Sequence, residues 1–196
     1  MLNPSNGSAR VLRAGLLIVR GEPEVAIEEA LRARSLDPLN LLVNTGTGYT
    51  HYRARRFEAA LEAFHHTLTL DRAHIGSRMG VVLAGIALGR LDVSKGALDA
   101  AEAHGASPEQ VAIRRAYRCS GGGLCLGERL ARESASTSTA MAALEVALGE
   151  HDRAPNRLES AAEERKGDLI YSRRNVMFDP LVGDPRFEEL LNRIGI

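Results

Sequence analysis

Histidine is the first residue type to examine for chemistry, because its imidazole serves both as a general base and as a metal ligand. The chain has six histidines. His65 and His66 are adjacent, so on a helix they point about 100° apart and cannot bind one metal ion together. His51 has no second ligand four residues away, the spacing that would place two ligands on one helical face. This pattern predicts packed or solvated imidazoles, with no catalytic or metal site.

The two cysteines, Cys119 and Cys125, are the next candidates for chemistry. They flank three consecutive glycines at positions 121–123, and the segment lacks the four closely spaced ligands of a zinc site. The glycines also lack the lysine and the hydroxyl residue of a phosphate-binding loop. We therefore expect free thiols on either side of a turn between helices, with no metal and no cofactor. An enzyme that uses one of these thiols, with His151, is the catalytic alternative to a non-enzymatic protein.

Composition narrows the class of protein further. The 196 residues carry 25 Lys and Arg against 25 Asp and Glu, so the formal net charge is zero. Direct nucleic-acid binding is not expected, because it needs a basic surplus to displace counterions from phosphate. The N-terminus is polar, and no apolar stretch approaches the ~20 residues that span a membrane. We therefore expect a cytoplasmic protein of ordinary domain size that does not bind membranes.

A regular period organises the first half of the chain. Stepping by 34 brings short apolar or small residues into register, and it also aligns a turn position and larger side chains. The aligned residues are Ala14, Gly48 and Val82; Ala26, Ala60 and Ser94; Gly21, Arg55 and Gly89 at the turn; and the larger Phe64 and Leu98. Small residues let two helices approach closely, and larger ones fill the space to the next unit. The period therefore predicts consecutive pairs of antiparallel helices.

Residues 7–108 resemble the tetratricopeptide repeat family, whose signature is a 34-residue helix–turn–helix unit. The clearest match is the segment 57–64, and the departures from the family pattern are Arg13, Thr47 and Arg72. The resemblance implies a right-handed α-solenoid, in which stacked helix pairs form an extended concave surface.

The C-terminal residues 178–181 and 184–195 are similar to the end of tetratricopeptide regions that follow winged-helix, cyclase or kinase domains in bacterial regulators. Asp184 can cap a helix that begins with Pro185. The apolar residues of this helix recur as one stripe, at Phe187, Leu190, Leu191 and Ile194. A terminal helix with one apolar face suits the end of a solenoid, so we expect a structural cap rather than a docking motif.

These patterns predict an all-α protein with a single domain over residues 1–196. Pro155 is compatible with a helix only in the first turn, which places the start of the second helix of the last pair. We expect a right-handed α-solenoid of about five helix–turn–helix repeats, at residues 7–40, 41–74, 75–108, 109–134 (an irregular unit) and 135–167, with a C-terminal cap at 168–196.

In a solenoid of this kind the first helix of each pair lines the concave surface, where partners bind. The residues expected to point inward are mostly apolar, and they are Leu42, Thr45, Tyr49, Tyr52, Arg53, Met79, Leu83, Ile86, Ile113 and Tyr117. This set lacks the Lys, Asn and Arg clamp of the chaperone-binding members of the family, and it suits an amphipathic helix better. We therefore predict a non-enzymatic interaction scaffold that binds a peptide, a helix or a partner protein. The alternative is the sensory or oligomerising C-terminal region of a bacterial transcriptional or signalling regulator, which acts by self-association as a homodimer.

Overall fold

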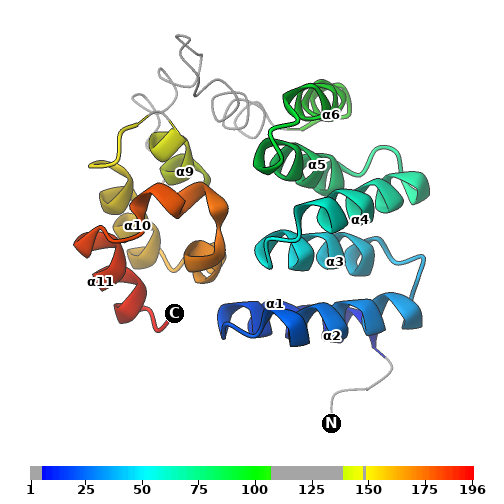
Figure 1. The fold of residues 1–196 in the computed structure, drawn as a ribbon, viewed down its shortest axis with the longest axis horizontal. Coiled ribbons are helices and arrows are strands. Elements are labelled where there is room, and N and C mark those ends of the chain that lie inside the picture. Colours follow the sequence, from blue (N-terminus) through cyan, green and yellow to red (C-terminus); the bar gives the residue numbers. More distant parts are fainter. Residues whose placement is uncertain (1–5, 107–138, 148) are drawn as a thin grey trace. The chain divides into compact units, whose positions relative to one another are not determined.

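Every regular element in the described part of the chain is a helix (Figure 1). The computed structural model describes residues 6–106, 139–147 and 149–196. No strand occurs among these residues, which confirms the all-α prediction for them. Contacts between residues group into two compact units, Met1–Ala106 and Ser107–Ile196. A single domain over the whole chain stays a prediction.

Three pairs of helices make up the described residues of the first unit. The first helices of the pairs are α1 (Gly7–Val19), α3 (Leu41–Arg53) and α5 (Ile75–Ala87), and the second helices are α2 (Pro23–Leu36), α4 (Phe57–Leu70) and α6 (Leu91–Ala103). In both series the helix starts recur with the period seen in the sequence. Each helix packs against the one that follows it in sequence, and α1, α3 and α5 also pack side by side. These contacts confirm the predicted consecutive packing of helices.

Each first helix begins at a side chain that caps its free N–H groups. Asn6, Asn40 and His74 occupy this position and are spaced by the same period. Asn40 Oδ1 accepts the backbone N–H of Leu42 at 3.0 Å, and His74 Nδ1 accepts that of Ser77 at 3.2 Å. A side-chain acceptor at this position typically stabilises a helix by about 1 kcal/mol. The caps therefore help to fix where each pair begins.

The turn inside each pair places one residue in the left-handed backbone region. Gly21, Arg55 and Gly89 have φ angles of 81°, 60° and 70°. The three residues that the sequence aligned therefore share one turn conformation. Glycine adopts this conformation without steric cost, whereas the Cβ of Arg55 makes it unfavourable.

Phe64 on α4 joins the second helix pair to the third. Its side chain is fully buried, and its ring lies against both Gly48 on α3 and Gly80 on α5. A Cβ atom added at Gly48 or at Gly80 would approach the ring to 2.5 or 2.4 Å, respectively. Since two carbon atoms in contact need a larger separation, this close packing depends on both glycines. Phe64 thus fills the space beside small residues, as the sequence predicted.

The described residues of the second unit form one helix pair followed by two 3₁₀ helices and a last α-helix. The elements are α9 (Thr139–Ala147), α10 (Ala154–Glu163), the 3₁₀ helices η1 (Gly167–Arg174) and η2 (Val176–Leu181), and α11 (Pro185–Arg193). α9 packs against α10, and Pro155 lies in the first turn of α10, as predicted. The irregular unit predicted at 109–134 lies outside the described residues.

The predicted C-terminal helix is present as α11. Asp184 caps it by accepting a 2.8 Å hydrogen bond from a backbone N–H of the first turn, and Pro185 is its first residue. The buried residues of its apolar stripe are Phe187, Leu190 and Leu191. The rings of Phe187 and Phe178 lie 6.0 Å apart, and α11 packs against α10. α11 therefore covers apolar side chains within the second unit.

Candidate functional site

Tyr49 is the predicted site residue that links α3 to α5. Its hydroxyl donates a hydrogen bond to the carbonyl oxygen of Gly76, at 3.1 Å. Its ring meets the Phe64 ring edge-on with centroids 5.0 Å apart, and the guanidinium of Arg53 lies over it at 5.4 Å. A cation–π contact of this kind is attractive by about 0.5–1 kcal/mol at an exposed site. Tyr49 and Arg53 are thus held in place while both stay partly exposed.

Thr45 takes part in a chain of hydrogen bonds between the same two helices. Thr45 Oγ1 lies 3.0 Å from Ser77 Oγ, which in turn lies 3.0 Å from His74 Nδ1. A serine beside a histidine is the arrangement of an activated nucleophile. Here the Ser77 side chain is fully buried, with an exposed fraction of 0%, so it is out of reach of a substrate. The polar groups of the three side chains therefore find hydrogen-bond partners in one another, between α3 and α5.

The other predicted site residues divide by exposure. The buried members are Thr45, Tyr52, Met79 and Leu83. Two members, Ile113 and Tyr117, lie outside the described residues. The members with accessible surface, here named the α3–α5 face, are Leu42, which is 55% exposed, and the half-buried Tyr49, Arg53 and Ile86. A ligand on the α3–α5 face would therefore meet apolar, aromatic and cationic groups.

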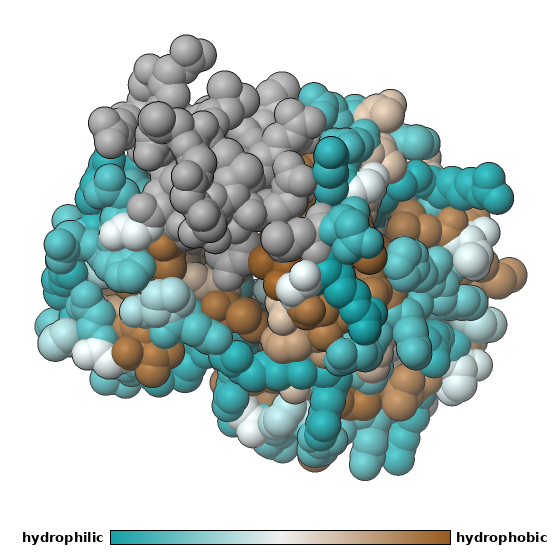
Figure 2. Space-filling view, turned by 45° about the horizontal axis from the view of Figure 1, so that its top comes forward, coloured by the Kyte–Doolittle hydropathy of each residue, from teal (hydrophilic) through white to brown (hydrophobic). Residues whose placement is uncertain are grey.

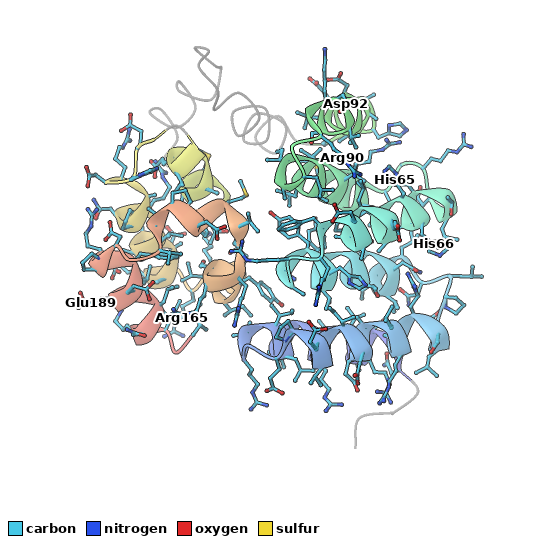
Figure 3. The ribbon with its side chains drawn as sticks, viewed as in Figure 1. His65, His66, Arg90, Asp92, Arg165 and Glu189 are labelled. Carbon is cyan, nitrogen blue, oxygen red and sulfur yellow. The ribbon has the colours of Figure 1, made fainter. Side chains whose placement is uncertain are left out.

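A depression of about 340 Å³ lies between α4, α5 and α6. Its apolar lining residues are Leu68, Val81, Val93 and Ala97, and its polar ones are His65, Arg78 and Asp92; Figure 3 labels His65 and Asp92. Gly96 also lines it, and a Cβ at Gly96 would have open space around it. Glu62 and Glu28 occupy the matching positions one and two repeat periods earlier. Sequence reasoning missed this depression, and the change from glutamate to glycine is the signal that could have found it.

A second depression, of about 220 Å³, lies between α10 and α11. Glu159 and Arg193 form an ion pair across it. Arg186 on its rim lies 3.1 Å from a carboxylate oxygen of Asp152, and a hydrogen bond from the Arg186 side chain lowers the pKa of Asp184. These charges pair with one another, so they join α11 to the segments packed beside it.

His51 on α3 has a pKa below its ordinary value of 6.5. Burial is the main cause, because it disfavours the charged imidazolium, and repulsion by Arg34 and Arg56 adds to it. Glu62 acts in the opposite direction. The Nδ1 atom of His51 is buried and has no hydrogen-bond partner among the described residues. The imidazole is therefore neutral and partly packed into the helix array, as the sequence predicted.

Hydrophilic side chains cover much of the surface between apolar ones. Figure 2 shows one face of the molecule, on which teal hydrophilic side chains interrupt the brown apolar ones. Ion pairs between neighbouring elements include Arg56 with Glu24, at 2.9 Å, and Arg173 with Glu188, at 3.1 Å. Exposed pairs of this kind contribute little to stability, and they keep the surface hydrophilic.

Neither a metal centre nor a membrane-spanning helix occurs among the described residues. No three His, Cys, Asp or Glu side chains come close enough there to hold a metal ion. None of the helices in these ranges is long and apolar enough to cross a membrane. A scan against protein-family models finds no match for the chain, and a search of curated proteins finds no significant relative.

Proposed function

We propose that the chain is a non-enzymatic scaffold of tetratricopeptide type, which binds a peptide, a helix or a partner protein on its first helices. The observation that carries this proposal is the array itself. Helix starts, N-terminal caps and left-handed turns all recur with one common period between residues 6 and 91. Stacked helix pairs of this kind present extended surfaces to protein partners.

The α3–α5 face is the part of this array with the chemistry of a binding surface. It combines Leu42 and Ile86 with a tyrosine and an arginine, and these last two residue types dominate the energy of many protein interfaces. The hydrogen bond and ring contacts of Tyr49 fix it before any ligand arrives. A surface that is already ordered loses less conformational entropy on binding, which favours affinity. An amphipathic helix could place its apolar side on such a face.

Substitution of Leu42 tests this proposal without disturbing the core, because Leu42 is 55% exposed. We would select peptides from a random displayed library against the 196-residue chain and measure their affinities for variants by fluorescence anisotropy. Leu42→Glu should weaken binding by about tenfold or more, because it places a charge where apolar contact is needed. Leu31→Glu is the matched control, since Leu31 is 40% exposed and lies on α2. It should leave the affinity unchanged.

Two results would contradict the proposal. One is a selection that yields no peptide above the level of an unrelated helical protein. The other is a set of peptides that bind wild-type chain, Leu42→Glu and Arg53→Glu with equal affinity, which would place their site away from the α3–α5 face.

A second candidate function is self-association, as in the oligomerising region of a bacterial transcriptional or signalling regulator. The distribution of exposed apolar side chains favours it. Seven of the nine large apolar residues that are exposed in the described part of the chain lie between Leu12 and Leu42. Four of them, Leu12, Leu16, Val25 and Leu36, lie on the first helix pair away from the α3–α5 face, and exposed apolar side chains that gather in one region are typical of an interface with another protein. The mass of the chain in solution tests this candidate directly.

A further inference from the structure

The first helix pair has one side that no described element covers. Its other side packs against α3, which contacts both α1 and α2. Four large apolar side chains are exposed on the uncovered side, here named the end face. They are Leu12 and Leu16 of α1, which are 66% and 58% exposed, and Val25 and Leu36 of α2, which are 43% and 48% exposed.

An ion cluster around one buried glutamate shows how the two helices meet at the end face. Glu29 of α2 is only 5% exposed, and its carboxylate lies 2.8 Å from Arg10 and 3.3 Å from Arg13, both on α1. Val25 and Leu36 lie four residues before Glu29 and seven after it, so they share its side of α2. Leu16 lies three residues after Arg13, which puts it beside Arg13 on α1. The four apolar side chains therefore flank this cluster on one surface.

The repeat register shows what this side of a helix pair normally contacts. The residues that match Leu12 in the second and third pairs are Gly46 and Gly80. A Cβ atom at Gly46 would lie 2.2 Å from Val11 Cγ1 in the preceding pair, and one at Gly80 would lie 2.4 Å from the Phe64 ring. The matching side of the second and third pairs is thus packed tightly against the pair before it.

Leucine at position 12 is incompatible with that packing. Where a Cβ atom alone does not fit at Gly46 or Gly80, a leucine side chain cannot fit either. A helix pair stacked on the end face as the second and third pairs are stacked would therefore have to leave space for this leucine. A helix pair whose outer surface faces water carries polar side chains there. The four exposed apolar side chains of the end face do not fit that pattern. The end face suits a partner that packs on leucine side chains.

The two helices of the first pair carry opposite charges, because α1 is basic and the first half of α2 is acidic. α1 and its C-cap carry Arg10, Arg13 and Arg20 and no acidic residue. The first half of α2 carries Glu24, Glu28 and Glu29, with Glu22 at its N-cap. Arg20 and Glu28 are both exposed. Arg10, Arg13, Glu24 and Glu29 form ion pairs within the chain, so Arg20 and Glu28 are the charges considered for a contact between copies. A two-fold axis that lays α1 of one copy on α2 of another brings Arg20 to Glu28 twice, because each contact in such a dimer occurs in both directions.

We infer that two copies of the chain associate end face to end face about a two-fold axis, with α1 of each copy against α2 of the other. Leu12, Leu16, Val25 and Leu36 form the apolar centre of this interface, and Arg20 and Glu28 form its charged rim. The inference deepens the second candidate function, self-association, and it is independent of ligand binding on the α3–α5 face.

Sedimentation equilibrium of the 196-residue chain, from about 1 to about 100 μM, tests the dimer. Wild-type chain should approach twice 21.1 kDa as its concentration rises. Leu16→Glu should raise the dimer dissociation constant about tenfold or more, because it buries a carboxylate in the apolar centre. Leu31→Glu, with its leucine on α2 outside the end face, is the matched control and should dimerise as wild-type does. Circular dichroism of both variants shows that the helices are retained.

A charge exchange tests the arrangement of the two helices. Arg20→Glu and Glu28→Arg should each weaken the dimer several-fold, because each places like charges opposite one another. The double variant Arg20→Glu/Glu28→Arg should regain most of the wild-type affinity, since both contacts are then reversed together. Additive weakening in the double variant would overturn the placement of α1 against α2.

The remaining outcomes separate this inference from both candidate functions. A chain that stays monomeric throughout the concentration range overturns the inference and the self-association function together. A dimer that Leu16→Glu leaves intact overturns the end face alone, because self-association then uses another surface. Leu16→Glu should leave the affinity for peptides on the α3–α5 face unchanged. A change of peptide affinity in Leu42→Glu therefore bears on the scaffold function and not on the dimer.

Discussion

His51 shows how one side chain can make the stability of the first unit depend on pH. Its Nδ1 atom is buried without a hydrogen-bond partner among the described residues, and Arg34 and Arg56 both oppose a positive charge on the ring. The folded protein therefore holds this imidazole neutral more strongly than the unfolded chain does. The same burial and the same neighbours also make His51 a poor general base, because a proton that it accepted would be destabilised at once.

The pKa of His51 predicts a fall in stability on mild acidification. Because the folded pKa lies below the ordinary value of 6.5, the unfolded chain binds more protons between these two values. The stability that the neutral ring contributes is complete above about pH 6.5 and is lost as pH falls through the folded pKa. Urea unfolding at several pH values from about 8 to about 5.5 should show a declining midpoint for wild-type chain and a smaller decline for His51→Gln.

A control at an exposed histidine makes this measurement specific. His66 lies on α4 with its side chain exposed, so His66→Gln should keep the wild-type dependence on pH. Parallel curves for wild-type chain and His51→Gln would show that His51 is not the titrating group responsible.

At the scale of helices, how closely neighbouring helices pack depends on which positions hold glycine. Gly48 and Gly80 both lie against the Phe64 ring, so a side chain added at either glycine would collide with it. Gly96 on α6 has no such neighbour within 4 Å. Two glycines inside helices of the same unit thus have opposite roles: Gly80 permits close packing, whereas Gly96 leaves the helix surface open.

Alanine substitutions at these two glycines should change stability in opposite directions. Gly80→Ala should lower the free energy of unfolding by about 1–3 kcal/mol, because overpacking against Phe64 outweighs the gain in helix propensity. Gly96→Ala should raise it by about 0.5–1 kcal/mol, since alanine favours the helix and meets open space. Both values follow from urea unfolding monitored by circular dichroism. Stabilisation by Gly80→Ala would show that the Phe64 ring moves freely.

Most of the helix array could be predicted from sequence, because its signals are local and periodic. The small residues Ala14, Ala26 and Ala60 are fully buried, as their register requires. The left-handed turns at Gly21, Arg55 and Gly89 recur as aligned. The period does not predict the 3₁₀ helices η1 and η2, since they lie where it has ended and no other repeat replaces it.

Less of the candidate site could be predicted, because exposure depends on neighbours that are distant in sequence. The register places Tyr52 and Leu83 on a binding surface, yet both are buried. The Tyr52 ring lies 5.7 Å from Phe57 of α4, a contact that its position on α3 alone does not reveal. The depression beside Gly96 likewise arises from three helices at once. Register identifies which helix lines a surface, and tertiary packing decides which side chains a ligand can reach.

At the scale of the whole molecule, the division into two units has a consequence for unfolding. Met1–Ala106 and Ser107–Ile196 are each compact by themselves, and compact units of one chain can open separately. Phe187 lies in the second unit, where it is 1% exposed and packs against Phe178. Phe187→Ala should remove about 3–5 kcal/mol of packing energy from that unit.

Hydrogen–deuterium exchange of the full chain can show whether this loss stays local. In Phe187→Ala, amides of α9, α10 and α11 should exchange faster, while those of α1 to α6 keep their wild-type rates. Gly80→Ala should do the reverse, because its strain falls between the second and third helix pairs of the first unit. Equal acceleration in both units by either variant would mean that the chain unfolds as one cooperative body. Separate responses would mean that each unit is stabilised by its own core, so a partner bound to the first unit need not stabilise the second.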